Sequence, residues 1–255
     1  MTTPQLLALL ASAAAAGFMN ALAGGGTILT FPTLILLGVP AIQANATSTV
    51  ALLPGAAASL AGYRREVATH RAWLRTLFVP SLVGGALGSM LLLATPEKLF
   101  ASLAPWLVLF ATLLFLFQAI RSRHPEVARE HPQTPTRFLL ATLGQFGVAL
   151  YGGYFGAGIG ILMLVILGFL GLTDIHAMNG LKNFFGICIN SLAAGYFIWK
   201  GAVLWPFALV MLAGAVAGGF AGAHFARRIG REKARVAVVG IGFFVFAVLL
   251  WQRYG

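Results

Sequence analysis

Charge is scarce in this chain. Only 9% of its 255 residues are charged and 59% are hydrophobic, with a mean hydropathy of +0.89, whereas soluble domains carry about 25% charged residues. Apolar runs recur along the chain, and the longer ones reach the roughly 20 residues needed to cross a bilayer. The longest polar stretch, 121–137, is a proline-punctuated loop too short to fold as a soluble domain. These features predict an all-α polytopic membrane protein.

Acidic residues and cysteine are nearly absent. None of the six acids lies in the middle of a long apolar run, so the sequence offers no carboxylate relay through the bilayer and disfavours a carboxylate cage for cations. The single cysteine, Cys188, excludes an intrachain disulfide. No HExxH metal motif, nucleophile elbow or phosphate-binding loop occurs. We therefore predict no cofactor, no metal and no enzymatic activity.

Positive charge is concentrated in three loops. A net charge of +11 would suggest a nucleic-acid partner for a soluble protein, but 13 of the 17 Lys and Arg fall within 64–75, 121–137 and 227–235. The positive-inside rule places such loops in the cytoplasm, so topology explains them and we predict no nucleic-acid partner. The first basic residue is Arg64, so the apolar run at 5–22 lacks the basic start of a signal peptide and is expected to be a retained helix.

The chain reads as two copies of one unit. Placing Gly25 on Gly158 also places Gly38 on Gly171, and we call this superposition of the two halves the repeat alignment. We predict a first membrane repeat at 1–120, a cytoplasmic linker loop at 121–137 and a second membrane repeat at 138–255. In the first half the loop after the third segment is basic, whereas in the second half the loop after the fourth segment is basic. Equivalent loops therefore face opposite sides, which predicts inverted-topology repeats with both termini outside the cytoplasm.

Glycine clusters interrupt the apolar sequence at equivalent places in both halves. The stretch NALAGGGTILTFP covers 20–32, and GGYFGAGIG covers 152–160. Each cluster leads into an arm, 27–39 or 158–172, that is too short to span a bilayer comfortably. Broken helices occur in membranes only where protein buries them or where they line a cavity, and paired breaks point to a transporter's binding site. Each half is thus predicted to hold a broken or re-entrant helical hairpin followed by three transmembrane helices; close packing through small residues is the alternative reading of the glycines.

Polar residues follow each hairpin, in QANATST at 43–49 and HAMNGLKN at 176–183. Lys182 is the only basic residue well inside an apolar run, and an intramembrane charge indicates function unless the lysine reaches the interface or is held by a helix end. Backbone N–H groups at broken helix ends, with Asn and Thr donors, favour an anion. Asn20 and Asn45 also suit plain interhelical hydrogen bonding. The predicted binding residues are Asn20, Gly24, Gly25, Gly26, Asn45, Thr47, Ser48, Gly156, Gly158, Asn179, Lys182 and Asn183.

Three stretches together resemble the sulfite exporter TauE/SafE family of permeases: NALAGGGTILTFPTL, GVPAIQANATST and AMNGLKN. The resemblance covers essentially the whole chain, and the glycines at 24–26, Asn45, Thr47 and Lys182 fall on the family's motif positions. It implies transport of small sulfur-containing anions, such as sulfite, sulfoacetate or other organosulfonates, across the bacterial cytoplasmic membrane. The chain departs from the family in a less glycine-dense second cluster and in Phe185, where the family often has Asn.

The sequence therefore predicts a secondary transporter that moves such an anion across the inner membrane by alternating access. An anion channel with the same lining, or a transporter of another small anion such as a carboxylate, is the alternative. An intramembrane enzyme is disfavoured because no nucleophile, base and metal set converges. The sequence leaves a homodimer, the coupling ion and the direction of transport open.

Overall fold

The computed structural model describes residues 2–22, 25–60, 67, 69–121, 134–229 and 231–254. These ranges form ten α-helices and contain no strand, which confirms the predicted all-α class. Residues 64–66, 68, 122–133 and 230 of the three basic loops lie outside the described residues, as does Gly24, whereas 71–75, 227–229 and 231–235, predicted as loop, are helical. The helices are α1 (Thr3–Leu22), α2 (Thr27–Leu36), α3 (Ala41–Leu60), α5 (Arg71–Ala94), α6 (Glu97–Arg121), α7 (Pro135–Tyr154), α8 (Ile159–Phe169), α9 (Ile175–Trp199), α10 (Trp205–Ile229) and α11 (Arg231–Tyr254).

Length and composition suit these helices to a bilayer. Four of the described helical stretches are long and apolar enough to cross one: Trp73–Ala94, Glu97–Ile120, His176–Trp199 and Trp205–Gly222. The outer surface exposes large apolar side chains, among them Trp251 at 75%, Trp199 at 74% and Phe244 at 69%. A soluble protein rarely exposes so much apolar surface, whereas lipid solvates it. The chain is accordingly a multi-pass membrane protein.

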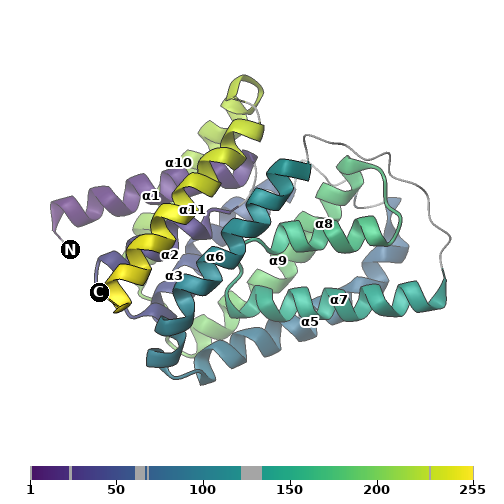
Figure 1. The fold of residues 1–255 in the computed structure, drawn as a ribbon, viewed down its shortest axis with the longest axis horizontal. Coiled ribbons are helices and arrows are strands. Elements are labelled where there is room, and N and C mark those ends of the chain that lie inside the picture. The colour runs from purple at the N-terminus through teal and green to yellow at the C-terminus, as the bar shows by residue number, and fades with distance from the viewer. Residues whose placement is uncertain are drawn as a thin grey trace.

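The closest helix pairings join the two halves of the chain. Helix α1 packs along α10, and α5 packs along α7, on opposite sides of the molecule, while α6 lies beside α11 and α3 contacts α9 (Figure 1). The repeat alignment converts α1 into α7 and α5 into α10, so the α1–α10 and α7–α5 pairs correspond to each other. The α6–α11 and α3–α9 pairs each correspond to themselves. This is the pattern of contacts expected of two related halves, and the repeats themselves stay a prediction.

Glycines allow the two end pairs to pack closely. A Cβ atom on Gly84 or Gly88 of α5 would overlap backbone atoms of α7, and one on Gly214 or Gly218 of α10 would overlap backbone atoms of α1. Each pair of glycines has the four-residue spacing that brings one helix backbone against another in membranes. Small residues therefore do serve packing here, and Gly153 of the second glycine cluster takes part, because a Cβ atom on it would overlap the backbone of Gly85.

The two hairpins have matching backbones. Helices α1 and α7 have 20 residues each and are about 30 Å long, whereas α2 and α8 have 10 and 11 residues and cover only about half that distance. Gly25 before α2 and Gly158 before α8 both adopt left-handed backbone, at φ 93° and 81°. Gly38 and Gly171, which follow the two short helices, do so as well, at φ 83° and 86°. The short arms cannot span a bilayer, as the sequence predicts.

Candidate functional site

A cavity of about 560 Å³ lies where the two hairpin breaks come together. Residues from α1, α2, α3, α6, α8, α9 and α10 line it, together with the break at 155–158. Both halves of the chain therefore contribute to one chamber. Its polar lining residues are Asn20, Thr27, Thr49, Gln118, Lys182, Asn183 and Asn190.

Side-chain hydrogen bonds hold both breaks open. In the first break the Oδ1 atom of Asn20 accepts a hydrogen bond from the backbone N–H of Gly26, at 2.7 Å. In the second break the hydroxyl of Tyr151 donates to the carbonyl of Ala157, also at 2.7 Å. Bonds of this kind replace helical hydrogen bonds where the chain changes direction. They give polar backbone groups at the breaks a partner within the protein.

The first turns of α2 and α8 border the cavity. Thr27, the first residue of α2, lines it, as do Ile159 and Gly160 at the start of α8. The first backbone N–H groups of a helix carry the positive end of its dipole, although several of them donate within the breaks here: Gly26 to Asn20, Ile28 to the Gly25 carbonyl and Ile161 to the Gly158 carbonyl. The cavity thus receives two helix N-termini, one from each half, and this arrangement favours a negatively charged ligand.

Lys182 brings a basic side chain to the same chamber. It lies on α9, is half-buried and is the sole charged side chain among the described residues that line the cavity. Its aliphatic stem passes over the start of α8, because a Cβ atom placed on Gly160 would lie 3.1 Å from the Cδ atom of Lys182. Asn183 follows it, and Asn190 lies two helical turns further along α9. One face of α9 therefore supplies a cation and two amides.

Aromatic rings form one wall of the cavity. Phe155 lines the chamber, is 1% exposed and contacts Phe31 edge to face, with ring centroids 5.3 Å apart. Phe100 lies behind it and contacts both Phe31 and Tyr154, at 6.3 Å and 5.6 Å. We call these four residues the aromatic cluster. Edge-to-face packing of this kind makes a rigid apolar barrier on that side of the cavity.

Comparison with known proteins settles which family this architecture represents. The model of the family described as sulfite exporter TauE/SafE matches residues 9–249. The chain belongs to this family. Among similar proteins, a probable membrane transporter protein of Haemophilus influenzae is 28% identical over 93% of this chain and 91% of its own length. The probable membrane transporter protein YfcA of Escherichia coli K12 is 27% identical over 100% of this chain and 93% of its own. No solved structure matches the chain.

These similarities identify the protein as a membrane transporter of the TauE/SafE family. They also confirm the family resemblance of the glycine-rich and Asn-containing stretches. The matched range runs from α1 into α11 and includes both hairpins. The cavity is therefore built from elements that all lie within the matched range.

Six of the predicted binding residues line the cavity of this TauE/SafE protein. They are Asn20, Gly25, Gly156, Gly158, Lys182 and Asn183. Gly26 borders the break, where Asn20 accepts a hydrogen bond from its backbone N–H. Asn179 is half-buried on α9, outside the lining. Gly24 lies outside the described residues.

Three predicted residues on α3 are buried in helix packing and do not line the cavity. The Nδ2 atom of Asn45 donates to the carbonyl of Tyr154 at the end of α7, at 3.0 Å. Thr47 accepts a hydrogen bond from the backbone N–H of Leu204, at 3.0 Å, and Ser48 lies 2.6 Å from the hydroxyl of Thr30. These bonds join α3 to α7, to the start of α10 and to α2, so this polar stretch braces the helices around the chamber.

Four polar lining residues are absent from the predicted set. Thr49 is the repeat mate of Lys182, so the repeat alignment would have found it once Lys182 was chosen; Thr27 corresponds to Gly160, which the predicted set also lacks. Asn190 is seven residues after Asn183 and so lies on the same face of α9. Gln118 has no such signal, because its place near the end of an apolar run resembles that of an ordinary interface residue.

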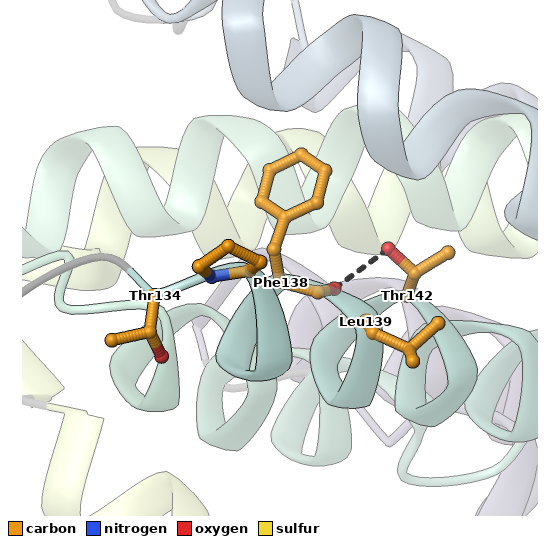
Figure 2. A pocket seen from close by; sticks show the side chains of 5 residues that line it. Thr134, Phe138, Leu139 and Thr142 are labelled. Atoms are coloured by element: carbon orange, nitrogen blue, oxygen red, sulfur yellow. Dashed lines mark hydrogen bonds between the residues drawn. The ribbon is translucent and has the colours of Figure 1, made fainter.

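A second hollow lies at the start of α7 (Figure 2). It is lined by Thr134, Pro135, Phe138, Leu139 and Thr142. The Thr142 hydroxyl donates to the Phe138 carbonyl of its own helix, at 2.8 Å, and Thr134 caps the first turn of α7. Its two hydroxyl groups are thus engaged within α7, and no charged side chain is among its lining residues in the described part of the chain. We therefore assign no functional role to this hollow.

Proposed function

We propose that the protein is a secondary transporter that binds a small sulfur-containing anion in the cavity between the hairpins and moves it by alternating access. One observation carries this proposal: Lys182 and the N-termini of α2 and α8 meet at a single cavity inside the membrane-spanning part of the chain. A cation beside the positive end of a helix is unfavourable by itself. An anion between them is attracted by all three groups, so the arrangement is stable with an anion bound.

The size of the cavity supports an organic anion over bare sulfite. A volume of 560 Å³ lies within the range of about 300–1,000 Å³ that is usual for pockets that bind organic ligands. An oxyanion with four heavy atoms fills a small part of this space. The remaining wall includes Phe115, Phe155 and Leu164, which suit an apolar or aromatic body. We therefore favour organosulfonates as substrates, with the sulfonate held by Lys182 and the helix N-termini.

Alternating access is supported by the arrangement around the cavity. The aromatic cluster closes one side, and the two hairpins come from halves whose helices pair in matching ways. Rocking of two inverted repeats around a fixed central site is the common mechanism for transporters built in this way. We propose the repeats at 1–120 and 138–255, and a bacterial inner-membrane location with both termini outside the cytoplasm. The N-terminal end of α1 and the C-terminal end of α11 lie on the same side of the molecule, which fits that topology (Figure 1).

Calorimetric titration of the purified protein in detergent tests the proposed site. The ligands are sodium benzenesulfonate, sodium ethanesulfonate, sodium sulfite and sodium acetate, titrated into wild type and Lys182→Met. We expect the sulfonates to bind wild type most tightly. Lys182→Met removes a hydrogen bond to a charged group, worth about 1.5–3 kcal/mol, so sulfonate affinity falls about tenfold to a hundredfold.

Equal sulfonate affinity in the two proteins would remove Lys182 from the site. Tighter binding of acetate than of any sulfonate would replace the proposed substrate class by carboxylates. The two proteins must have equal melting temperatures without ligand, which shows that the substitution leaves the fold intact.

A further inference from the structure

Equivalent positions in the two halves present different chemistry to the cavity. Under the repeat alignment Thr49 corresponds to Lys182, and Thr27 corresponds to Gly160. All four residues line the cavity, and all four are half-buried. One half therefore contributes two threonines at the positions where the other contributes a lysine and a glycine.

The glycine of the second pair lies directly under the lysine. A Cβ atom on Gly160 would be 3.1 Å from Cδ, 3.6 Å from Cγ and 3.8 Å from Cε of Lys182. The first of these distances is shorter than carbon atoms normally adopt in contact, since their optimal separation is about 3.5–4.0 Å. An alanine at position 160 would therefore press on the Lys182 stem, which would have to move by a few tenths of an ångström.

The backbone does not explain a glycine at this position. Gly160 is absent from the residues with positive φ, whereas its neighbour Gly158 is left-handed at φ 81°. Within a helix, alanine is more favourable than glycine by about 0.8–1.0 kcal/mol. In the first half the equivalent position holds Thr27, and the residue equivalent to Lys182 is the short Thr49, whose hydroxyl donates to the Asn45 carbonyl of its own helix at 2.9 Å. The glycine therefore lies at the point where the long side chain of Lys182 crosses α8.

We propose that Gly160 is a positioning residue for Lys182: the missing side chain lets the lysine stem lie against the first turn of α8, and this contact sets where the ammonium group stands in the cavity. This inference rests on the proposed function, in which Lys182 holds the anion. With the ammonium group in this position, the sulfonate head of the substrate lies between it and the N–H groups of α8. The threonine pair of the first half then forms the uncharged wall of the site.

The test is a double-mutant cycle on the full chain in detergent, read by calorimetric titration with sodium benzenesulfonate. Gly160→Ala in the wild-type background is expected to weaken binding about tenfold, because it displaces the ammonium from its hydrogen-bonding position. Gly160→Ala in the Lys182→Met background is expected to cause no further loss. Gly168→Ala is the matched control, since Gly168 lies on the same short helix, is exposed and does not line the cavity.

The outcomes distinguish the positioning role of Gly160 from the anion-binding role of Lys182. An equal loss from Gly160→Ala in both backgrounds would mean that the alanine acts on the ligand or the backbone, and would overturn the positioning role. Unchanged affinity in Gly160→Ala, with a loss in Lys182→Met, would overturn positioning and leave the proposed function standing. Unchanged affinity in Lys182→Met would overturn the binding role itself. Melting temperatures without ligand exclude unfolding as the cause of any loss.

Discussion

Individual residues differ in how far their roles can be predicted from sequence. Lys182 is conspicuous because a charge within an apolar run is costly, and the structure places it in the cavity. Asn45 and Thr47 match the family's motif equally well, yet they brace α3 against other helices. Sequence spacing gives the helix on which a polar residue lies, but not whether its side chain meets a neighbouring helix or a cavity. Gly160 illustrates the same limit, since its neighbour in space, Lys182, belongs to a different helix.

Backbone conformation at the hairpin breaks gives a prediction at the residue scale. Gly158 lines the cavity with φ at 81°, a region that costs an alanine about 1–2 kcal/mol. We expect Gly158→Ala to lower the free energy of unfolding by that amount, measured by denaturant titration in detergent. Gly147→Ala is the control: Gly147 is an exposed residue of α7 with open space around its Cβ position, so alanine there leaves stability equal or slightly higher. Equal stability of the two variants would contradict a strained break.

The helical elements follow closely from the sequence pattern. The recurring apolar runs form the described helices, and both short arms begin beside the predicted glycine clusters. The C-terminal ends of α2 and α8 follow from Gly38 and Gly171. Both glycines adopt left-handed backbone, and the two helices end with matching hydrogen bonds. The sequence pattern does not predict which helices pack against each other. The pairing of α1 with α10, and of α5 with α7, depends on close approach at glycines that are remote in sequence from the backbone they contact.

At the scale of the whole molecule, the matching helix pairs support the duplication, and the topology of the halves remains a prediction. Lys98 at the start of α6 and Lys200 at the end of α9 are exposed, and both belong to loops predicted to lie outside the cytoplasm. Arg71 at the start of α5 is exposed and predicted to lie inside. Inverted repeats require this arrangement, because equivalent loops of the two halves face opposite sides.

Cysteine labelling checks the topology. Single cysteines replace Lys98, Lys200 or Arg71 in a Cys188→Ser background, and a membrane-impermeant maleimide is added to intact cells. We expect the cysteines at 98 and 200 to be labelled, and the cysteine at 71 to be labelled only after the cells are opened. Labelling of 98 and 200 from opposite sides would show that the halves are not inverted.

The central claim is that the cavity between the hairpins carries an organosulfonate through the membrane, with Lys182 holding its charge. Its most direct test is accumulation of radiolabelled benzenesulfonate in proteoliposomes that contain wild type or Lys182→Met, under an imposed ion gradient. We predict that wild type accumulates the sulfonate above its external concentration and that Lys182→Met accumulates at least about tenfold less. Equilibration without accumulation would indicate a channel, and equal accumulation by the two proteins would contradict the proposed site.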